Sequence, residues 1–276
     1  MNKIGVIISY RPDTDLKAKI LEAQSIGLES CQLSIWTPSL FTAEEAAKIK
    51  GITRETGFEI SALWSGWTGP CEWNFTHGPI TIGLVPEAYR GIRTQELCRA
   101  SDFAEMLGVR DIITHVGFLP NNPNDPDYLG TIGALRYITG IMEKRSQRFL
   151  FETGQETPVT LLRAISDIGR TNVGINLDTA NLILYGMANT LDALDVFGQY
   201  VMNTHIKDGV YPTEPRMLGK EVQAGKGKAN IPATVKRLLE LGYEGHFTIE
   251  REISGEQQRL DIIETIAFLK SILNGQ

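Results

Sequence analysis

The chain has 276 residues, of which 42% are hydrophobic, and it carries a formal net charge of −6. This acidic composition lacks the basic footprint of general nucleic-acid binding, and no apolar stretch reaches membrane-spanning length. The three cysteines are odd in number and without paired spacing, so they indicate free thiols in a reducing compartment rather than a disulfide framework. The N-terminal segment MNKIGVIISY has no signal-peptide pattern. We therefore predict a cytoplasmic protein that binds neither nucleic acid nor membrane.

Strand-like and helix-like segments alternate along the whole chain. A strand at 4–9, a helix at 14–26 and a strand at 30–36 come first, and Thr42, with Glu44 and Glu45 after it, begins the next helix. The remaining strands are predicted at 59–65, 111–117, 148–154, 173–181, 201–208 and 246–252, and a last helix at 256–273. Eight strand–helix units in 276 residues predict an α/β fold, a single (β/α)8 TIM barrel spanning 1–276, rather than an open doubly wound sheet.

Two connections are longer than the others, at 66–90 and 209–230. Both follow a strand, so both are expected at the C-terminal face of the barrel, where long loops commonly cover a substrate. The second connection contains AGKGKAN at 224–230, which has two glycines but no Walker pattern for phosphate. We interpret it as a mobile loop before a helix that is capped by Asn230 and entered through Pro232.

Four successive strands each end in a residue that a divalent metal ion takes as a ligand. These residues are Glu152, Asp178, His205 and Glu250. Alternate residues of a barrel strand point inward, and functional groups gather at the C-terminal strand ends, so all four are expected at one height. Three carboxylates and one imidazole suit Mn²⁺, Mg²⁺, Co²⁺ or Zn²⁺, and crowded carboxylates require a cation. We predict one divalent ion per chain, with Mn²⁺ favoured, and a partner such as Asp208 or Asn203 for the second imidazole nitrogen of His205.

The segments FETG, LDTAN, THIKD and TIERE, with HVG at the fourth strand, resemble the xylose-isomerase-like barrel superfamily. That superfamily includes ketose 3-epimerases, small sugar isomerases, inosose dehydratases and endonuclease IV type enzymes. The resemblance implies that Glu152, Asp178, His205 and Glu250 bind the metal, and that Glu152 and Glu250 also transfer protons. It implies a sugar epimerase or isomerase that acts through a metal-stabilised enediolate, and an association into dimers or tetramers.

Residues around this core are candidates for binding the carbohydrate substrate. They are His115, Glu156, Asn181, Lys207 and Arg216. Trp36 and Trp64, at the ends of the second and third strands, are candidates for an apolar wall against a sugar face. The chain departs from the epimerase pattern at Asn181, where several relatives have histidine, and at Tyr211, where they have arginine. These departures leave the substrate open.

Other functions remain open at this point. A lyase of the inosose dehydratase kind would use the same metal site and expel a hydroxyl group after enolisation. An endonuclease IV type phosphodiesterase would need further histidines for a multi-metal cluster, and His246 is expected at the opposite end of its strand. A sugar-binding barrel without catalytic activity is the last alternative.

Overall fold

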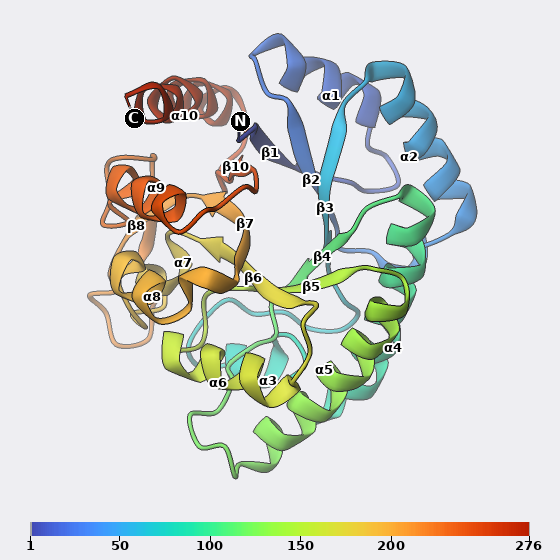
Figure 1. The fold of residues 1–276 in the computed structure, drawn as a ribbon, viewed down its shortest axis with the longest axis vertical. Coiled ribbons are helices and arrows are strands. Elements are labelled where there is room, and N and C mark those ends of the chain that lie inside the picture. Colours follow the sequence, from blue (N-terminus) through green and yellow to red (C-terminus); the bar gives the residue numbers. More distant parts are fainter. Residues whose placement is uncertain (1, 276) are drawn as a thin grey trace.

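The computed structural model describes residues 2–275. Its centre is a closed barrel of parallel strands arranged around the axis in chain order (Figure 1). The barrel strands are β1 (Ile4–Ser9), β2 (Ser30–Ile35), β3 (Glu59–Ser65), β4 (Asp111–Thr114), β5 (Arg148–Glu152), β6 (Val173–Asp178), β7 (Val201–Ile206) and β10 (Phe247–Ile249). Pairing of β1 with β10 closes the ring, which confirms the predicted (β/α)8 TIM barrel.

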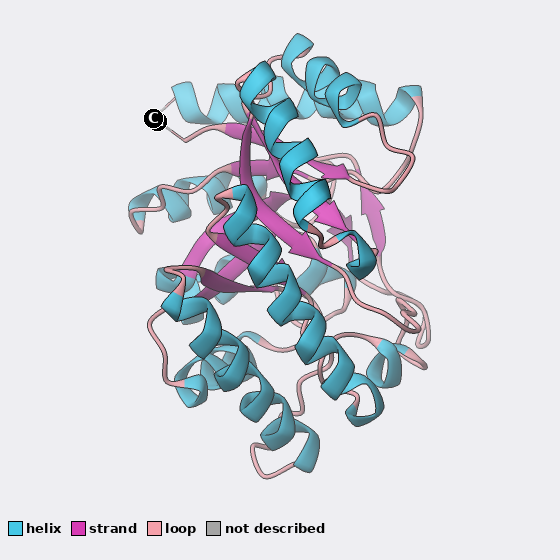
Figure 2. Cartoon of the chain, turned by 90° about the vertical axis from the view of Figure 1, so that its right-hand side faces the viewer, coloured by secondary structure: helices cyan, strands magenta, loops and turns pink. Residues whose placement is uncertain are grey.

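Helices surround the barrel and cover its strands from outside (Figures 1 and 2). They are α1 (Leu16–Ser25), α2 (Ala43–Thr56), α3 (Gly78–Thr81), α4 (Glu87–Leu107), α5 (Pro126–Lys144), α6 (Pro158–Ile168), α7 (Asn181–Leu184), α8 (Thr190–Phe197), α9 (Ile231–Glu240) and α10 (Glu256–Asn274), with short 3-10 turns at Pro38–Leu40 and Gly198–Tyr200. Thr42 caps α2 as predicted, because its side chain accepts a hydrogen bond from the Glu45 amide. The first helix begins two residues later than predicted, since Asp15 caps it through the Ala18 amide.

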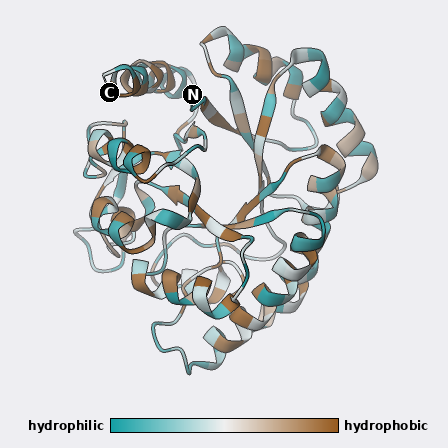
Figure 3. Ribbon diagram, viewed as in Figure 1, coloured by the Kyte–Doolittle hydropathy of each residue, from teal (hydrophilic) through white to brown (hydrophobic). Residues whose placement is uncertain are grey.

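Hydrophobic side chains fill two layers. The larger core lies between strands and helices and includes Ile20, Phe103 and Phe149, all fully buried. Hydrophobic and hydrophilic residues alternate along the outer helices, as expected for helices with one face on the barrel (Figure 3). Inside the barrel, Trp64 and Leu150 belong to a smaller apolar cluster. Buried polar side chains also lie inside the barrel, where Gln32, Asn176 and Asn203 form hydrogen bonds beneath the strand ends.

Arg93, on α4, holds the first long loop in place. Its guanidinium group donates to the carbonyl oxygens of Thr68 (3.2 Å), Pro70 (2.9 Å), Thr81 (2.7 Å) and Gly83 (2.7 Å). The side chain is 1% exposed, and burial lowers its pKa to about 10, so it remains charged at neutral pH. A buried cation bound by four carbonyls fixes the loop after β3 against the outer helix.

Asp208 organises the second long loop, which contains an unpredicted hairpin of β8 (Asp208–Val210) and β9 (Lys220–Val222). Its carboxylate accepts hydrogen bonds from the amides of Gly209, Gly225, Gly227 and Ala229, at 2.8–3.0 Å. A Cβ on Gly227 would lie 2.1 Å from the Asp208 carboxylate, so only glycine allows this approach. The glycines of the AGKGKAN segment therefore serve chain folding around Asp208.

Asn230 occupies the N-cap position of the following helix, as predicted. Asn230 directly precedes α9, but it adopts a left-handed backbone conformation (φ 46°), and its side chain makes no capping hydrogen bond. Pro232 lies in the first turn, as predicted, where its missing amide costs no intrahelical hydrogen bond.

Candidate metal centre and substrate cavity

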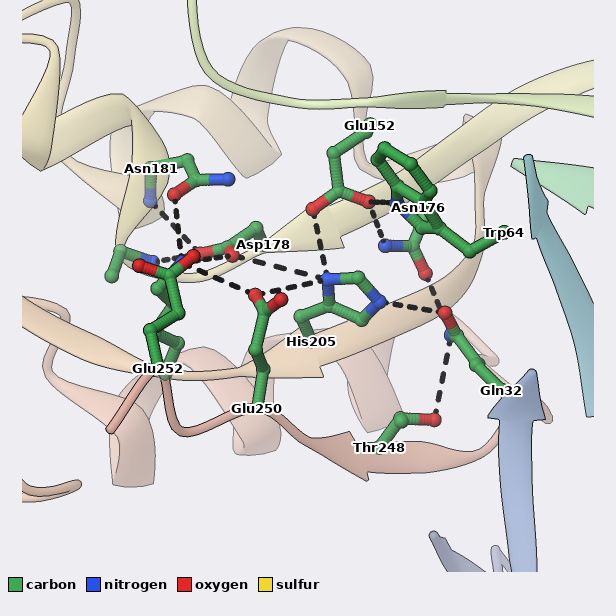
Figure 4. A network of polar contacts seen from close by, with 12 residues as sticks. Gln32, Trp64, Glu152, Asn176, Asp178, Asn181, His205, Thr248, Glu250 and Glu252 are labelled. Carbon is green, nitrogen blue, oxygen red and sulfur yellow. Dashed lines mark hydrogen bonds and ion pairs between the residues drawn. The ribbon is translucent and has the colours of Figure 1, made fainter. Parts of the chain in front are cut away.

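The four predicted ligands meet at the C-terminal end of the barrel. Glu152 ends β5, Asp178 ends β6, His205 lies in β7 and Glu250 directly follows β10. One ligand atom from each lies within 4.8 Å of the others, and the close-up shows them facing a common point (Figure 4). His205 Nδ1 lies 2.8 Å from Glu152 Oε1, 3.3 Å from Glu250 Oε2 and 3.9 Å from Asp178 Oδ2. Neighbouring parallel strands with the same inward parity produce this convergence.

Each buried ligand has one atom held by the protein and one atom free. Asp178 Oδ1 accepts hydrogen bonds from the amides of Ala180 (2.7 Å) and Asn181 (2.9 Å), whereas its Oδ2 has no hydrogen-bond partner. Glu152 Oε2 accepts from Asn176 Nδ2 (2.6 Å), which leaves Oε1 to face the cluster. His205 Nδ1 is also buried without a hydrogen-bond partner. Unpartnered acceptors aimed at one point are what a metal ion satisfies.

Gln32, from β2 on the other side of the barrel, is the partner of the second imidazole nitrogen of His205. The distance from His205 Nε2 to Gln32 Oε1 is 2.6 Å. Gln32 Nε2 donates to the side-chain oxygens of Asn176 and Asn203, both at 3.0 Å, so the amide must present its oxygen to the imidazole. His205 therefore carries its proton on Nε2 and offers the Nδ1 lone pair to a metal ion.

This arrangement corrects the prediction that Asp208 or Asn203 would orient His205. Asp208 binds loop amides, and Asn203 accepts a hydrogen bond from Gln32. Gln32 and Asn176 were not among the predicted site residues, because both lie in the middle of a strand and not at its end. The available signal was a buried-type strand, SCQLSIW, with an amide in the middle of its inward-facing positions.

Lys207 brings a positive charge next to the carboxylates. Its ammonium group lies 3.5 Å from Asp178 Oδ2, 3.2 Å from Glu250 Oε2 and 2.7 Å from Glu252 Oε1, and the side chain is only 2% exposed. Burial disfavours its charge, but these carboxylates raise the pKa of Lys207 well above its ordinary value. The three ligand carboxylates (−3), Glu252 (−1) and Lys207 (+1) together leave a formal charge of −3 around a neutral imidazole. A divalent cation would offset most of this charge.

The pKa values of Asp178 and His205 also indicate that the cluster favours a bound positive charge. Burial raises the pKa of Asp178 well above its ordinary value, and the nearby Glu250 and Glu152 carboxylates add to this effect. Burial opposes a charge on His205, yet the Glu152 and Glu250 carboxylates raise its pKa well above its ordinary value. The residues present therefore fit a divalent metal ion, with Glu152, Asp178, His205 and Glu250 as its ligands.

A cavity of about 330 Å³ opens above the cluster. Its polar lining includes Glu250, Asn181 and His115, and its apolar lining includes Trp36 and Trp64. Glu250 is the exposed member of the ligand set, with a side chain 20% accessible, whereas Glu152 and Asp178 lie underneath. A molecule in this cavity would therefore contact the candidate metal centre from the Glu250 side.

The predicted substrate-binding residues lie at different places. His115 and Asn181 line the cavity, and Lys207 lies below it, bound to the Asn181 side-chain oxygen at 3.2 Å. Burial lowers the pKa of His115 to about 4, so its ring is neutral at neutral pH, and its Nδ1 has no hydrogen-bond partner. Glu156 is 4% exposed and does not line the cavity. Arg216 is exposed and does not line it either.

His246 lies at the opposite end of the barrel, as expected. Its Nδ1 is 2.7 Å from the Ser30 hydroxyl group, and its Nε2 is 3.5 Å from Glu59. It is therefore remote from the ligand set. The only cluster of three or more metal-type ligands found within residues 2–275 is the four-residue one.

A (β/α)8 barrel with a four-residue candidate metal centre at the C-terminal strand ends defines the class of protein. A sequence model of the family described as the xylose isomerase-like TIM barrel matches residues 20–272. The crystal structure of a xylose isomerase domain protein from Planctomyces limnophilus is 32% identical, with a TM-score of 0.91 over 98% of this chain and 96% of that one. The chain belongs to the xylose isomerase-like TIM barrel family.

More distant structures share the fold. A xylose isomerase-like TIM barrel protein from Mycobacterium smegmatis, solved in complex with magnesium, is 16% identical, with a TM-score of 0.73 over 100% of this chain and 97% of that one. The 3-keto-D-glucoside 4-epimerase of E. coli is 15% identical, with a TM-score of 0.72 over 98% of this chain and 100% of that one. No curated protein sequence matches the chain. Within residues 2–275, none of the helices combines the length and the apolar character needed to cross a membrane.

Proposed function

We propose that the protein is a divalent-metal-dependent sugar epimerase or isomerase. The observation that carries the proposal is the convergence of Glu152, Asp178, His205 and Glu250, with two unpartnered ligand atoms, directly below an open cavity. Membership of the xylose isomerase-like family and the fold shared with a sugar epimerase support it. The substrate would be a small carbohydrate. Assembly into dimers or tetramers and a cytoplasmic location remain predictions.

The donor set favours a hard or borderline ion. Three carboxylates and one imidazole suit Mn²⁺ or Mg²⁺, and Co²⁺ and Zn²⁺ are alternatives. The similar Mycobacterium smegmatis protein was crystallised with magnesium. The excess negative charge of these carboxylates over Lys207 also favours a bound cation. We favour Mn²⁺ because it accepts mixed nitrogen and oxygen ligands more readily than Mg²⁺ does.

Glu152 and Glu250 are the proposed proton-transferring pair. The ion would supply Lewis-acid polarisation of a substrate carbonyl and its neighbouring hydroxyl group. One carboxylate would take the proton from the adjacent C–H group. The electron pair of that bond would form a carbon–carbon double bond, and the π pair of the carbonyl group would move to its oxygen, which gives an enediolate of the substrate. Glu152 and Glu250 come from β5 and β10, on either side of β6 and β7. Return of the proton by the second carboxylate, from the other face, inverts the carbon.

Three further residues would position the substrate. His115 stays neutral because its pKa is about 4, so its ring can exchange hydrogen bonds with a hydroxyl group without adding charge. Asn181 and Lys207 form a hydrogen-bonded pair at the cavity floor, next to Glu250. Glu156 is not part of the candidate metal cluster, and neither Glu156 nor Arg216 lines the cavity. A role for either of these two in substrate binding therefore requires movement of their loops.

Metal stoichiometry after stripping and reloading with Mn²⁺ tests the metal centre. Glu152→Gln should lose the ion, because it replaces a ligand oxygen aimed at His205 Nδ1. Glu156→Gln is the matched control, since it changes an equally buried glutamate four residues away that does not belong to the cluster. One ion per chain in the wild type and in Glu156→Gln, but not in Glu152→Gln, is the expected result. Retention by all three proteins would refute the assigned ligand set.

Incubation of the Mn²⁺ protein with a panel of ketoses and keto-glycosides in D₂O tests the reaction. Epimerisation or isomerisation places solvent deuterium on carbon and leaves the composition of the sugar otherwise unchanged. Loss of water from the product would instead establish the dehydratase alternative on the same site. If the metal-bound protein catalyses neither deuterium exchange nor loss of water with any member of the panel, both the epimerase or isomerase function and the dehydratase alternative would be refuted for these sugars.

A further inference from the structure

All four tryptophans of the chain gather at one wall of the substrate cavity. Trp36 follows β2, Trp64 lies near the end of β3, and Trp67 and Trp73 belong to the loop held by Arg93. The ring centroid of Trp36 lies 4.8 Å from that of Trp64, 5.1 Å from that of Trp67 and 6.2 Å from that of Trp73. The wall is therefore one continuous aromatic surface built from three segments of the chain.

Two of these indoles are available to a ligand. Trp36, Trp64 and Trp73 line the cavity, but only Trp36 and Trp73 are substantially exposed, at 36% and 41%. Trp64 and Trp67 are about one-twentieth exposed and pack against Trp36. The planes of Trp36 and Trp73 meet at 89°, so the two exposed rings form a corner rather than a flat platform. Gly66 permits this placement, because a Cβ there would lie 2.6 Å from the Trp36 Cα atom. Exposed tryptophans held in a fixed corner are suited to a compact, rigid partner.

The cavity lining offers no cationic side chain to an anionic partner. Glu250 and Glu252 line it, and none of the lining residues, all of which belong to the described part of the chain, is lysine or arginine. Lys207 is bound by the surrounding carboxylates and is 2% exposed, so it is not free to receive a phosphate group. An anionic ligand would have to displace these contacts and approach two carboxylates.

We propose that the substrate is an uncharged sugar in ring form, with its carbonyl group and reacting C–H on a ring carbon. Its C–H face packs into the corner of Trp36 and Trp73, and its polar edge points to Glu250 and the metal centre. A pyranose ring presents a rigid apolar face that fills such a corner, whereas an acyclic ketose would lose conformational entropy and cover less of the indoles. This inference rests on the proposed function and narrows its substrate class.

Intrinsic tryptophan fluorescence reads out this wall directly, because the chain has no tryptophan elsewhere. We would titrate the Mg²⁺-loaded protein with three probes. They are methyl 3-keto-α-D-glucopyranoside, which is an uncharged ring, L-erythrulose, which is too short to close a stable ring, and D-fructose 6-phosphate, which is anionic. The ring probe should change the fluorescence saturably and bind at least about tenfold more tightly than either of the others. Tighter binding of the phosphate or of the acyclic ketose would overturn the proposal.

Variants separate stacking from metal binding. Trp36→Ala should weaken binding of the keto-glycoside about tenfold, Trp36→Phe should weaken it less, and both should retain the ion. Trp73→Ala gives an independent test should Trp36→Ala unfold, because Trp73 belongs to a different segment. Tyr137→Ala, an exposed aromatic on α5 outside the cavity, is the matched control and should bind as the wild type does. Unchanged affinity in both alanine variants would refute the stacking role.

Failure of this inference is distinguishable from failure of the proposed function. Deuterium exchange into erythrulose, with no fluorescence response to the ring probe, would support the proposed metal-dependent enzyme and refute the proposed ring substrate. Saturable binding of the ring probe by a protein that holds no ion would support the proposed aromatic binding site and refute the proposed metal-dependent reaction.

Discussion

The two halves of the barrel mouth differ in kind. Strands β5, β6, β7 and β10 supply the four candidate ligands, whereas β2, β3 and the loop after β3 supply the aromatic wall. The ligand half is charged and consists of strand ends whose positions follow from the barrel itself. The aromatic half depends on a loop that Arg93 fixes from outside the barrel. Chemistry and recognition are thus carried by different parts of the chain, which meet where the Trp64 indole N–H donates to Glu152 Oε2 at 3.4 Å. We expect each part to tolerate damage to the other.

Asp178→Asn should break the ligand half most completely. The asparagine oxygen would accept the two amide hydrogen bonds that Asp178 Oδ1 accepts now, which would turn its NH₂ group toward the other ligands. We expect loss of stoichiometric Mn²⁺ binding, measured by elemental analysis and calorimetry, with the aromatic wall intact by fluorescence. Glu252→Gln removes a neighbouring carboxylate outside the cluster and should retain the ion. One ion per chain in Asp178→Asn would contradict the assignment.

Arg93→Gln should break the aromatic half. The shorter, neutral side chain leaves several of the four loop carbonyls without a donor, and we expect a loss of about 3 kcal/mol in the free energy of unfolding. Denaturant unfolding would measure the loss, and tryptophan emission would report loosening of the wall. Mn²⁺ stoichiometry should stay at the wild-type value. Arg99→Gln, on the same helix with a side chain 54% exposed, is the control.

An Arg93→Gln protein with wild-type stability and emission would show that the loop is held by other contacts. Loss of Mn²⁺ together with the loop would show that the two halves are coupled. Either result would contradict the division into a ligand half and an aromatic half that Arg93 holds in place.

Gln32→Leu tests a side chain of β2 that reaches across the barrel to the ligand half. It removes the acceptor that holds His205 Nε2–H, so the imidazole loses its fixed orientation, and we expect Mn²⁺ affinity to fall about 10- to 100-fold. Calorimetric titration with Mn²⁺ would measure the change. Gln24→Leu, an exposed position on α1, serves as the control. Wild-type affinity in Gln32→Leu would mean that another group orients the imidazole.

The ligand half was largely predictable from sequence, because strand ends and inward parity determine where Glu152, Asp178, His205 and Glu250 project. The aromatic half was predictable only in part. Trp36 and Trp64 lie at strand ends and were identified, but the part played by Trp73 depends on the path of a loop. That path is set by hydrogen bonds from a guanidinium group to main-chain oxygens, which leave no pattern in side-chain types.

Contacts between distant strands were also beyond the sequence. Gln32 and His205 are 173 residues apart and meet only because the barrel closes. Asp208 looked like a partner for His205 because it is close in sequence, yet its position after β7 directs it to the loop that follows. Proximity along the chain was therefore a poor guide to orientation inside the barrel.

Glu156→Gln should leave both halves of the barrel mouth intact. It tests whether Glu156 carries a charge next to the ligand half. Burial raises the pKa of Glu156 from 4.5 to about 8, and the nearby Glu152 carboxylate contributes. Between these two values the unfolded chain releases the proton while the folded chain holds it. The free energy of unfolding therefore falls as the pH rises from about 4.5 to 8 and is constant above that range.

Glutamine has the shape of the protonated acid and no proton to lose. We expect Glu156→Gln to be more stable than the wild type by on the order of 4 kcal/mol at pH 8, and the difference should disappear toward the acid end of the window. Denaturant unfolding of both proteins at several pH values measures this difference, in which the titration of all shared groups cancels. Glu244→Gln, at an exposed position, should show a difference that does not depend on pH. A wild-type advantage that grows with pH would mean that Glu156 is ionised in the folded protein, so that the ligand half holds one more negative charge than the metal centre and Lys207 account for.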